Sequence, residues 1–383
     1  MRRAQGCLLQ HIVNTDYLLP YGQLIANHRR GLSLNATGVY IWELLGDEPS
    51  REELRQKFLE RFLTEPGQEE MLTSDLYQFL DQLVASGLAE DDAPPQIHNQ
   101  VPSAYIKIGG ITVSIAAPCE LIDNSFLKDF STAPSERIDQ RVIVSFAPPL
   151  FRTNGTILVR DTELVVCERE RDYLILFPTF SQIREVSLSK DGTDVVFRCI
   201  HPVNEDLEFQ FFHALRLAFL YLAEKRGMYA IHSASILYRD RAWLFSASAG
   251  TGKSTHVNLW RELYQTAVLN GDLNLLAIED GRPVIHGIPW CGTSEVFDKR
   301  TLPLGGIVLL LRGTRDYVEE LSDDQKALLI LQRFISPIWT AEQLGDSAQF
   351  AEQLSGIINV CRMHCTKDTS AAETMRRWID EKL

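Results

Sequence analysis

Apolar positions in the first ninety residues recur with helical spacing in three segments. Asn35 is placed to cap the first helix, and Ser50 and Glu53 have the spacing of a capping box ahead of the second. Apolar side chains from Leu72 to Val84 fall on one face of the third. Two short strand-like segments precede these helices. The pattern predicts a small β-hairpin plus three-helix module, a winged-helix-like α+β fold.

Residues 104–204 change to short, alternating apolar runs separated by Gly, Pro and Asp, which is typical of β-strands. Just before them, residues 93–103 are polar and rich in proline and interrupt all periodicity, which indicates a linker. We therefore predict four parts: the module over 1–92, the linker, a β-rich segment and a last domain over 205–383.

Composition and charge are those of a globular protein that avoids nucleic acid. The 383 residues are 45% hydrophobic and 23% charged, enough for two or three domains. The net charge of −13 repels a phosphate backbone. Residues 1–92 hold eight basic and fifteen acidic side chains, the wrong balance for a winged-helix DNA binder. We expect no nucleic-acid partner.

No segment has the pattern of a signal peptide or a membrane span. The longest apolar run, Leu304–Leu311, is under half of the roughly 20 residues that a span needs. Seven scattered cysteines fit a reducing compartment; Cys361, His364 and Cys365 could begin a zinc site, but free buried cysteines are the preferred interpretation. We expect a soluble, cytoplasmic protein with no membrane partner.

Residues 247–255 read Ala-Ser-Ala-Gly-Thr-Gly-Lys-Ser-Thr between a predicted strand and a predicted helix, the context of a phosphate-binding loop. Backbone N–H groups of such a loop bind phosphate oxygens in front of the helix N-terminus. Lys253 is expected to reach the β- and γ-phosphates of ATP, and the Ser254 hydroxyl to ligate Mg²⁺. The predicted nucleotide-binding residues are Ser248, Ala249, Gly250, Thr251, Gly252, Lys253, Ser254 and Thr255.

A phosphoryl transferase also needs a carboxylate for its metal and a group that takes the proton of the acceptor. Asp272 ends an apolar run after the loop, and a parallel strand beside the loop strand would bring it to the phosphates, although it could instead be a turn residue. His232 lies in an apolar stretch before the loop, where it is either a catalytic or a core residue. Ala247 replaces the usual first glycine, which is tolerable if its φ stays negative.

These residues together resemble the catalytic domain of HPr serine kinases, and more closely the kinases of this type found with ribosomally made peptide natural products such as lasso peptides. The resemblance covers residues 205–383. It is carried by His232, the loop, Asn270-Gly-Asp272 and Gly287-Ile-Pro-Trp-Cys-Gly. It implies an α/β P-loop kinase fold with a catalytic His232. Glycine at 271 leaves one acid, Asp272, where the family has two in succession.

Lys299 and Arg300 follow the Gly-Ile-Pro-Trp segment and are candidates to stabilise charge on a transferred phosphoryl group, with a solvated basic pair as the alternative. The predicted catalytic residues are His232, Lys253, Asp272 and Arg300. The predicted metal ligands are Ser254 and Asp272.

The module at the front resembles PqqD-like peptide-recognition domains over residues 15–90. The resemblance is carried by Leu34-Asn-Ala-Thr-Gly-Val-Tyr-Ile-Trp-Glu-Leu-Leu and by the final Phe79-Leu-Asp-Gln-Leu-Val-Ala-Ser-Gly-Leu. It implies that the leader of a precursor peptide binds as an added strand beside Gly31–Leu34, against the exposed side of Asp75–Val84.

The two resemblances predict an ATP- and Mg²⁺-dependent kinase that holds a precursor peptide by its leader and phosphorylates a hydroxyl, most simply of serine. Two alternatives stay open: a leader-binding adaptor on a decayed kinase fold, and a kinase for a small metabolite. The sequence does not choose between ATP and GTP. It leaves the oligomeric state open, with a homo-oligomer among the possibilities.

Overall fold

The computed structural model describes residues 1–383 except 5, 23, 24, 26–30, 65, 66, 87, 91–100, 147–154, 249 and 250. Most of the predicted linker 93–103 lies outside the described residues. The chain forms two compact units, one of residues 1–101, 143–187 and 196–202, the other of residues 102–142, 188–195 and 203–383. The domain boundaries inferred from the sequence stay predictions.

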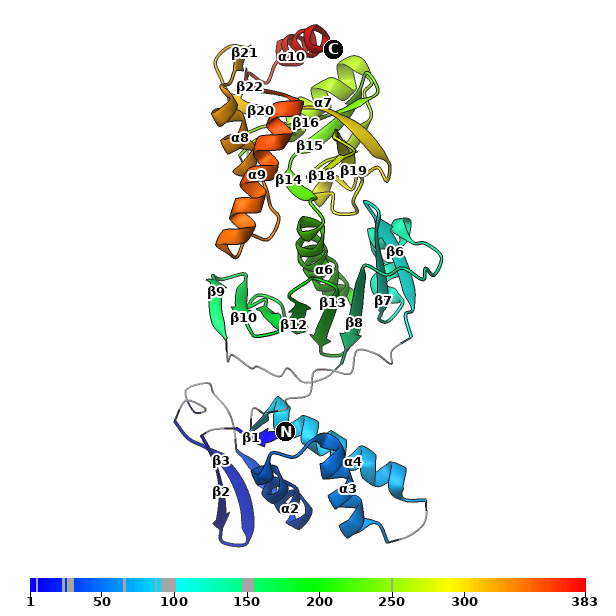
Figure 1. Cartoon of the computed structure of the whole chain (residues 1–383), viewed down its shortest axis with the longest axis vertical. Coiled ribbons are helices and arrows are strands. Elements are labelled where there is room, and N and C mark those ends of the chain that lie inside the picture. Colours follow the sequence, from blue (N-terminus) through cyan, green and yellow to red (C-terminus); the bar gives the residue numbers. More distant parts are fainter. Residues whose placement is uncertain are drawn as a thin grey trace. The chain divides into compact units, whose positions relative to one another are not determined.

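The N-terminal part of the first unit contains the expected strands and helices (Figure 1). Its elements are β1 (Arg2–Arg3), β2 (Cys7–Ile12), β3 (Thr15–Pro20), β4 (Leu32–Leu34), α2 (Ala36–Leu44), η1 (Leu45–Asp47), α3 (Arg51–Phe62), α4 (Glu69–Ala85) and β5 (Ala89–Glu90). Strands β2, β3 and β4 form an antiparallel sheet in that order. The Asn35 side chain accepts a hydrogen bond from the Gly38 N–H at 2.8 Å, and Ser50 and Glu53 form the predicted capping box.

The middle of the chain is rich in strands, as its alternating pattern predicts. The strands are β6 (Ala104–Ile108), β7 (Ile111–Ala116), β8 (Gln140–Ser145), β9 (Thr156–Arg160), β10 (Val165–Glu168), β11 (Asp172–Leu176), β12 (Ile183–Ser189) and β13 (Asp194–Cys199). β6 pairs with β7, and β10 pairs with both β9 and β11, all antiparallel. Two short helices, α5 (Glu120–Asp123) and η3 (Phe126–Phe130), follow β7, and the long helix α6 (Glu205–Lys225) follows β13.

A mixed nine-stranded sheet is the centre of the second unit. Its strands are β14 (Tyr229–His232), β15 (Ala234–Tyr238), β16 (Arg241–Ser246), β17 (Val268–Asn270), β18 (Leu273–Glu279), β19 (Arg282–His286), β20 (Thr301–Arg312), β21 (Tyr317–Glu320) and β22 (Asn359–Cys365). Seven run in the order β14-β18-β19-β20-β16-β15-β17, and β22 joins β20. β20 is parallel to both β16 and β22, which gives the mixed α/β architecture expected from the sequence.

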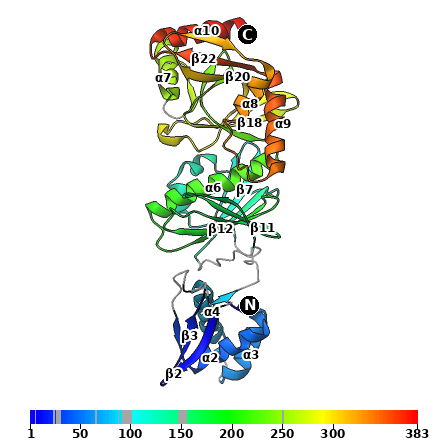
Figure 2. The ribbon, with the colours of Figure 1, turned by 90° about the vertical axis from the view of Figure 1, so that its left-hand side faces the viewer.

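Helices cover both faces of this sheet (Figures 1 and 2). One apolar core contains side chains of α7 (Lys253–Tyr264) and α10 (Thr369–Lys382), such as Trp260 and Met375. The other contains side chains of α8 (Asp323–Leu331) and α9 (Ala341–Ile357), such as Ile330 and Leu354. Strand β16 is therefore buried on both sides, and it leads directly toward α7.

Strands β14 and β15 follow each other closely but have different partners, since β14 pairs with β18 while β15 pairs with β16. One detail of the strands differs from the prediction. Strand β17, which leads to Asp272, does not lie beside the loop strand β16; β15 lies between them and is antiparallel to both. Since two antiparallel steps restore the direction, β17 and β16 still end at the same edge.

The sequence predicts no membrane-spanning segment. None of the helices in the described part of the chain is long and apolar enough to cross a membrane.

The residues that could have begun a zinc site lie on β22. Cys361 and Cys365 are buried there, and the His364 Nε2 lies 2.7 Å from Glu319 Oε2. Within the described ranges, no three His, Cys, Asp or Glu side chains are arranged to hold a metal.

Candidate active site

Three residues proposed from the sequence meet at one edge of the nine-stranded sheet. The Nε2 atom of His232 lies 2.6 Å from Lys253 Nζ and 3.2 Å from Asp272 Oδ1. These side chains come from β14, from the first turn of α7 and from the turn between β17 and β18. His232 and Asp272 are each about two fifths exposed, 38% and 40%, so the cluster is open to a ligand.

Backbone pairing brings His232 and Asp272 together. In the β14–β18 ladder His232 is opposite Leu273, and the Ser233 N–H donates to the Asp272 carbonyl at 3.0 Å. The Ser246 hydroxyl, at the end of β16, donates to the His232 carbonyl at 2.7 Å. The histidine is therefore fixed to the acid on one side and to the start of the loop segment on the other.

The position of His232 Nε2 gives both protonation states of the ring a partner. An unprotonated Nε2 accepts a hydrogen bond from the Lys253 ammonium group, whereas a protonated Nε2 donates to the Asp272 carboxylate. A ring that takes up a proton at Nε2 thus exchanges one charged partner for the other. A proton acceptor needs such partners in both states, and the catalytic role of His232 stays a prediction.

The charges in the cluster favour an ionised acid. The hydrogen bond from His232 is the main cause that lowers the pKa of Asp272, and the charges of Lys253 and Arg216 lower it further, against the opposing effect of burial. Burial lowers the pKa of Lys253, while the Asp272 charge opposes that effect. Asp272 is therefore an anion at neutral pH and suits a metal ligand better than a proton acceptor.

The turn that carries Asp272 is held by buried Asn270. Its Oδ1 accepts hydrogen bonds from the N–H groups of Asp272 and Leu273 at 2.9 and 3.0 Å, and its Nδ2 donates to the carbonyls of Ile288 and Trp290. A Cβ on Gly271 would lie 2.1 Å from Ser294 Oγ. A side chain at position 271 would therefore collide with Ser294 as it is placed here.

The predicted order of strand, loop and helix is found around residues 247–252. β16 ends at Ser246 and α7 begins at Lys253. Ala247 is buried and has no positive φ, so the missing first glycine causes no backbone strain. Gly252 has a φ of +118°, which a side chain would not tolerate. Ala249 and Gly250 lie outside the described residues.

The remaining loop residues are placed for a ligand outside the core. The Thr251 N–H donates to the Ser248 carbonyl at 3.1 Å, and the Ser254 and Thr255 side chains are exposed in the first turn of α7. Oxygen ligands such as the Ser254 hydroxyl and the Asp272 carboxylate suit Mg²⁺, which usually takes only one or two carboxylates and completes its shell with water and phosphate. The donor set fits this metal even though no cluster of three protein ligands exists among the described side chains.

Two arginines near this cluster were missed by the sequence analysis. Arg216 on α6 and Asp272 are close enough that each charge shifts the pKa of the other, yet the guanidinium has no hydrogen-bond or ion-pair partner among the described residues. Arg333 follows α8; its carbonyl accepts from the His232 N–H at 3.0 Å, and its Nη1 lies 3.4 Å from Ser248 Oγ. No motif marks either residue, because each lies in an element far from the loop in sequence.

Arg300, which the sequence suggested as a charge stabiliser, forms an ion pair with Asp298. Its Nη2 lies 2.7 Å from Asp298 Oδ2, and its Nε contacts both oxygens of that carboxylate at 3.0 Å. None of the contacts described above joins Arg300 to His232, Lys253 or Asp272. Its role as a charge stabiliser stays a proposal.

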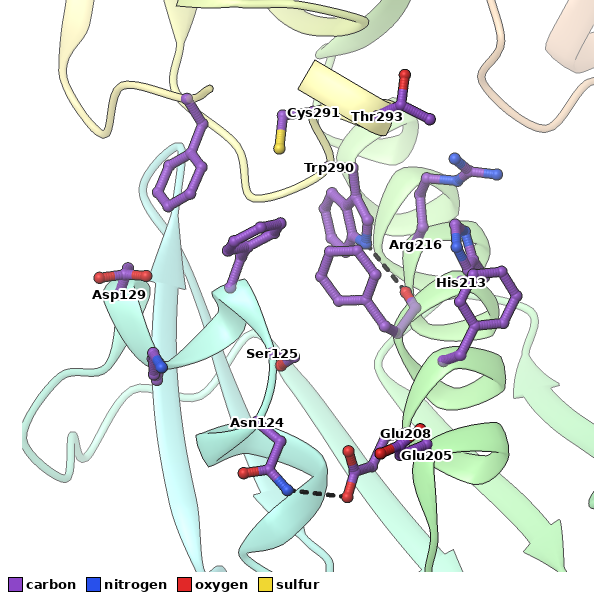
Figure 3. A pocket seen from close by; sticks show the side chains of 16 residues that line it. Asn124, Ser125, Asp129, Glu205, Glu208, His213, Arg216, Trp290, Cys291 and Thr293 are labelled. Carbon is purple, nitrogen blue, oxygen red and sulfur yellow. Dashed lines mark hydrogen bonds between the residues drawn. The ribbon is translucent and has the colours of Figure 1, made fainter. Parts of the chain in front are cut away.

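A cavity of about 710 Å³ is lined by Gly292, whose Cβ position lies next to the Asp272 side chain (Figure 3). Its walls are η3, α6 and the segment from Trp290 to Phe297. Five aromatic side chains line it: Phe126, Phe209, Phe212, Trp290 and Phe297. Trp290 is fixed by a 3.0 Å hydrogen bond from its Nε1 to the Phe212 carbonyl. The sequence analysis did not foresee this cavity.

Comparison with known proteins identifies the N-terminal module. Residues 23–89 match the family model "Coenzyme PQQ synthesis protein D (PqqD)", so this part of the chain is a PqqD domain, as its motifs indicate. None of the curated proteins compared with the chain is similar enough to count as a match.

Two solved structures are similar to parts of the chain. One is "TbiB1 in Complex with the TbiA(beta) Leader Peptide", with 23% identity over 24% of this chain and 100% of that chain and a TM-score of 0.20. The other is the HPr(Ser) kinase/phosphatase from Coxiella burnetii, with 12% identity over 40% of this chain and 93% of that chain and a TM-score of 0.23. Scores this low carry no structural argument, so the function proposed below rests on the residues of this chain.

Proposed function

We propose that this chain is a kinase that transfers the γ-phosphoryl group of ATP to a hydroxyl of a precursor peptide, and that the PqqD domain holds the leader of that peptide. The observation that carries the proposal is the contact of His232 Nε2 with both Lys253 and Asp272, next to a glycine-rich loop at the start of α7. A proton acceptor, a lysine for phosphates and a carboxylate for a metal are the groups that phosphoryl transfer requires.

In the proposed mechanism each residue has one task. Backbone N–H groups of residues 248–255 and the Lys253 ammonium bind the phosphates of ATP, which draws Lys253 away from His232. Nε2 of His232 is then free to take the proton of the acceptor hydroxyl as its oxygen bonds to the γ-phosphorus and the bond to the ADP oxygen breaks. The resulting imidazolium is stabilised by Asp272. Mg²⁺ held by Ser254 and Asp272 would neutralise charge on the phosphate oxygens.

The PqqD domain supplies a place for the leader. In the described part of its three-stranded sheet, β4 is an edge strand that pairs with β3 only. An edge strand can accept a peptide as an additional strand. We propose that the leader pairs with β4, against α4, and raises the local concentration of the acceptor segment at the kinase site.

Replacing His232 with alanine tests its role as proton acceptor. We expect turnover to fall by about 10² or more, the usual size of a general-base contribution, while ATP affinity changes little. Transfer rates and ATP titration measure both effects. A core histidine would behave differently, because melting temperature and activity would then fall together. A variant that melts and turns over like the parent would remove His232 from the mechanism.

Parallel substitutions of Arg216 and Arg300 with glutamine show which arginine stabilises the phosphoryl group. We expect Arg216→Gln to lower turnover by about 10², because its charge acts on Asp272 and has no ion-pair partner among the residues that the structure describes. Arg300→Gln should have a smaller effect, since Asp298 already compensates its charge. Steady-state rates for both variants provide the comparison. A larger loss in Arg300→Gln would favour the residue chosen from the sequence.

Deleting residues 1–92 tests the tether. We expect kcat/KM for a full-length precursor to fall by about 10², and kcat/KM for its leaderless core to stay within about twofold, because a tether acts only on peptides that carry the leader. In the intact chain, free leader peptide should inhibit use of the precursor but not of the core. Equal effects on both substrates would make the PqqD domain a structural element only.

A further inference from the structure

The aromatic cavity beside Asp272 has no role in the mechanism so far. We propose that it binds the acceptor segment of the peptide through a large apolar side chain next to the hydroxyl residue. The inference rests on the proposed function for the identity of the reaction, but the binding preference that it predicts can be measured without phosphoryl transfer.

One wall of the cavity lies against Asp272. Asp272 Oδ1 contacts His232, while Oδ2 lies 3.1 Å from the position that a Cβ on Gly292 would occupy, and Gly292 lines the cavity. Arg216 and Cys291 also line it, and the charge of Asp272 acts on both. The carboxylate thus lies between the histidine and the cavity wall. With the acceptor hydroxyl at His232, the neighbouring residues of the same peptide would lie close to this wall of the cavity.

The walls define the chemistry of the occupant. The Phe126 ring centroid lies 6.3 Å from that of Phe212 and 5.3 Å from that of Phe297, and Phe212 packs against Trp290 at 5.9 Å, which makes a continuous apolar surface. Phe209 leaves 61% of its surface exposed at one side of the cavity. Aromatic side chains in such a site gain most from an aromatic or large aliphatic partner.

Charge at the same cavity disfavours an acidic peptide segment. Glu205 and Glu208 lie in the first turn of α6 and Asp129 lies on the opposite wall (Figure 3), and these three acids outnumber the lining cations Lys128 and Arg216. Acidic residues beside the acceptor would meet like charges there. In the proposed mechanism the adenine ring is a less suitable occupant, because the cavity adjoins Asp272, which would act near the γ-phosphate, whereas the base would lie at the other end of the phosphate chain.

Two labelled, leaderless peptides test the proposal on the full chain with ADP and Mg²⁺ present: Gly-Phe-Ser-Phe-Gly and Gly-Ala-Ser-Ala-Gly. We expect fluorescence anisotropy to show that the phenylalanine peptide binds at least about tenfold more tightly, the factor that burial of one aromatic side chain supports. In Phe209→Ala this ratio should fall to about 2 or less, and in Phe209→Leu it should partly recover. Leu344→Ala, which removes an apolar side chain 48% exposed on α9, is the control and should keep the parent ratio.

The outcomes separate this proposal from the kinase proposal. No measurable binding of the phenylalanine peptide, equal affinities in the parent, or an unchanged ratio in Phe209→Ala would overturn the assignment of the cavity. Weaker ADP binding in Phe209→Ala would assign the cavity to the nucleotide base and would also overturn it. If the preference is present but labelled ATP gives no phosphoserine, the cavity assignment stands and the kinase proposal fails. Equal phosphorylation of both peptides with equal affinities would support the kinase proposal and overturn the cavity assignment.

Discussion

Lys253→Ala is expected to abolish phosphoryl transfer, by a factor of about 10³, while the affinity for a leader peptide stays that of the parent. Lys253 is the cation of the loop segment, and in the absence of nucleotide its Nζ contacts His232 Nε2 at 2.6 Å. Its removal takes away the group expected to bind the β- and γ-phosphates and to stabilise their charge in the transition state. The PqqD domain is built from other residues and should not respond. Phosphopeptide mass spectrometry measures the transfer, and a leader-binding titration measures the affinity for the leader.

A second lysine serves as the matched control. Lys326 forms an exposed pair with Asp323 on α8, at 2.8 Å, and lies in neither the loop nor the PqqD domain. Lys326→Ala should therefore keep both activities, since an exposed pair of this kind contributes at most about 1 kcal/mol to stability. Undiminished phosphorylation by Lys253→Ala would exclude the loop as the phosphate site. Lost leader affinity in the same variant would mean that the substitution disturbs the whole fold.

Asp272→Asn is expected to lower transfer by about 10² to 10³ and to raise the Mg²⁺ concentration needed for half-maximal rate. Asparagine keeps the shape and can still accept a hydrogen bond from His232, but it loses the negative charge that binds a hard cation. It also removes the anion that stabilises a protonated His232. Initial rates at fixed ATP and varied Mg²⁺ separate the two effects, because only the loss of a metal ligand shifts the Mg²⁺ dependence.

The control for this variant is an exposed acid. Asp323→Asn on α8 changes charge by the same amount at a site far along the chain from the cluster, and we expect its Mg²⁺ dependence to match the parent. If Asp272→Asn loses rate without any change in its Mg²⁺ dependence, Asp272 acts only on His232 and another group must hold the metal. If Asp272→Asn keeps both the rate and the Mg²⁺ dependence of the parent, Asp272 has no part in catalysis and is only a turn residue, as its Asn-Gly-Asp context also permits.

Local features of the sequence predicted local structure well. The caps at Asn35 and Ser50 depend on residues three positions away, so their spacing is sufficient to predict where α2 and α3 begin. The glycine-rich loop is likewise a continuous motif, and the strand and helix around it are found where they were expected. The strands beside the loop strand were predicted less well. The predicted order placed β17 next to β16, whereas β15 lies between them.

The site itself depends on contacts between distant residues. The sequence proposed His232, Lys253 and Asp272 separately, but the position of Nε2 between the other two follows from the β14–β18 register and the hydrogen bond from Ser246. Arg216 is one of many polar residues on a helix whose periodicity indicates only a buried face. Its approach to Asp272 is set by the packing of α6, which no local pattern encodes.

Gly271 shows how structure can account for a departure from a family pattern. A second acid would be expected there from the resemblance to HPr kinases, and its absence raised the alternative of a decayed, non-catalytic fold. In the structure, Ser294 Oγ occupies the space of a side chain at this position. The glycine at 271 and the position of Ser294 are thus matched to each other, and whether a site with one carboxylate works stays a prediction that Asp272→Asn tests.

The most direct test of the central claim is to incubate the intact chain with ATP, Mg²⁺ and a precursor peptide whose leader the PqqD domain binds, and to analyse the peptide by tandem mass spectrometry. We predict that the peptide gains a phosphoryl group on a hydroxyl side chain, that ADP forms in equal amount, and that neither product forms with Lys253→Ala. Leader-dependent binding of the peptide without any phosphorylation, under conditions where the chain binds ATP, would contradict the kinase proposal and leave an adaptor that holds peptide and nucleotide without joining them.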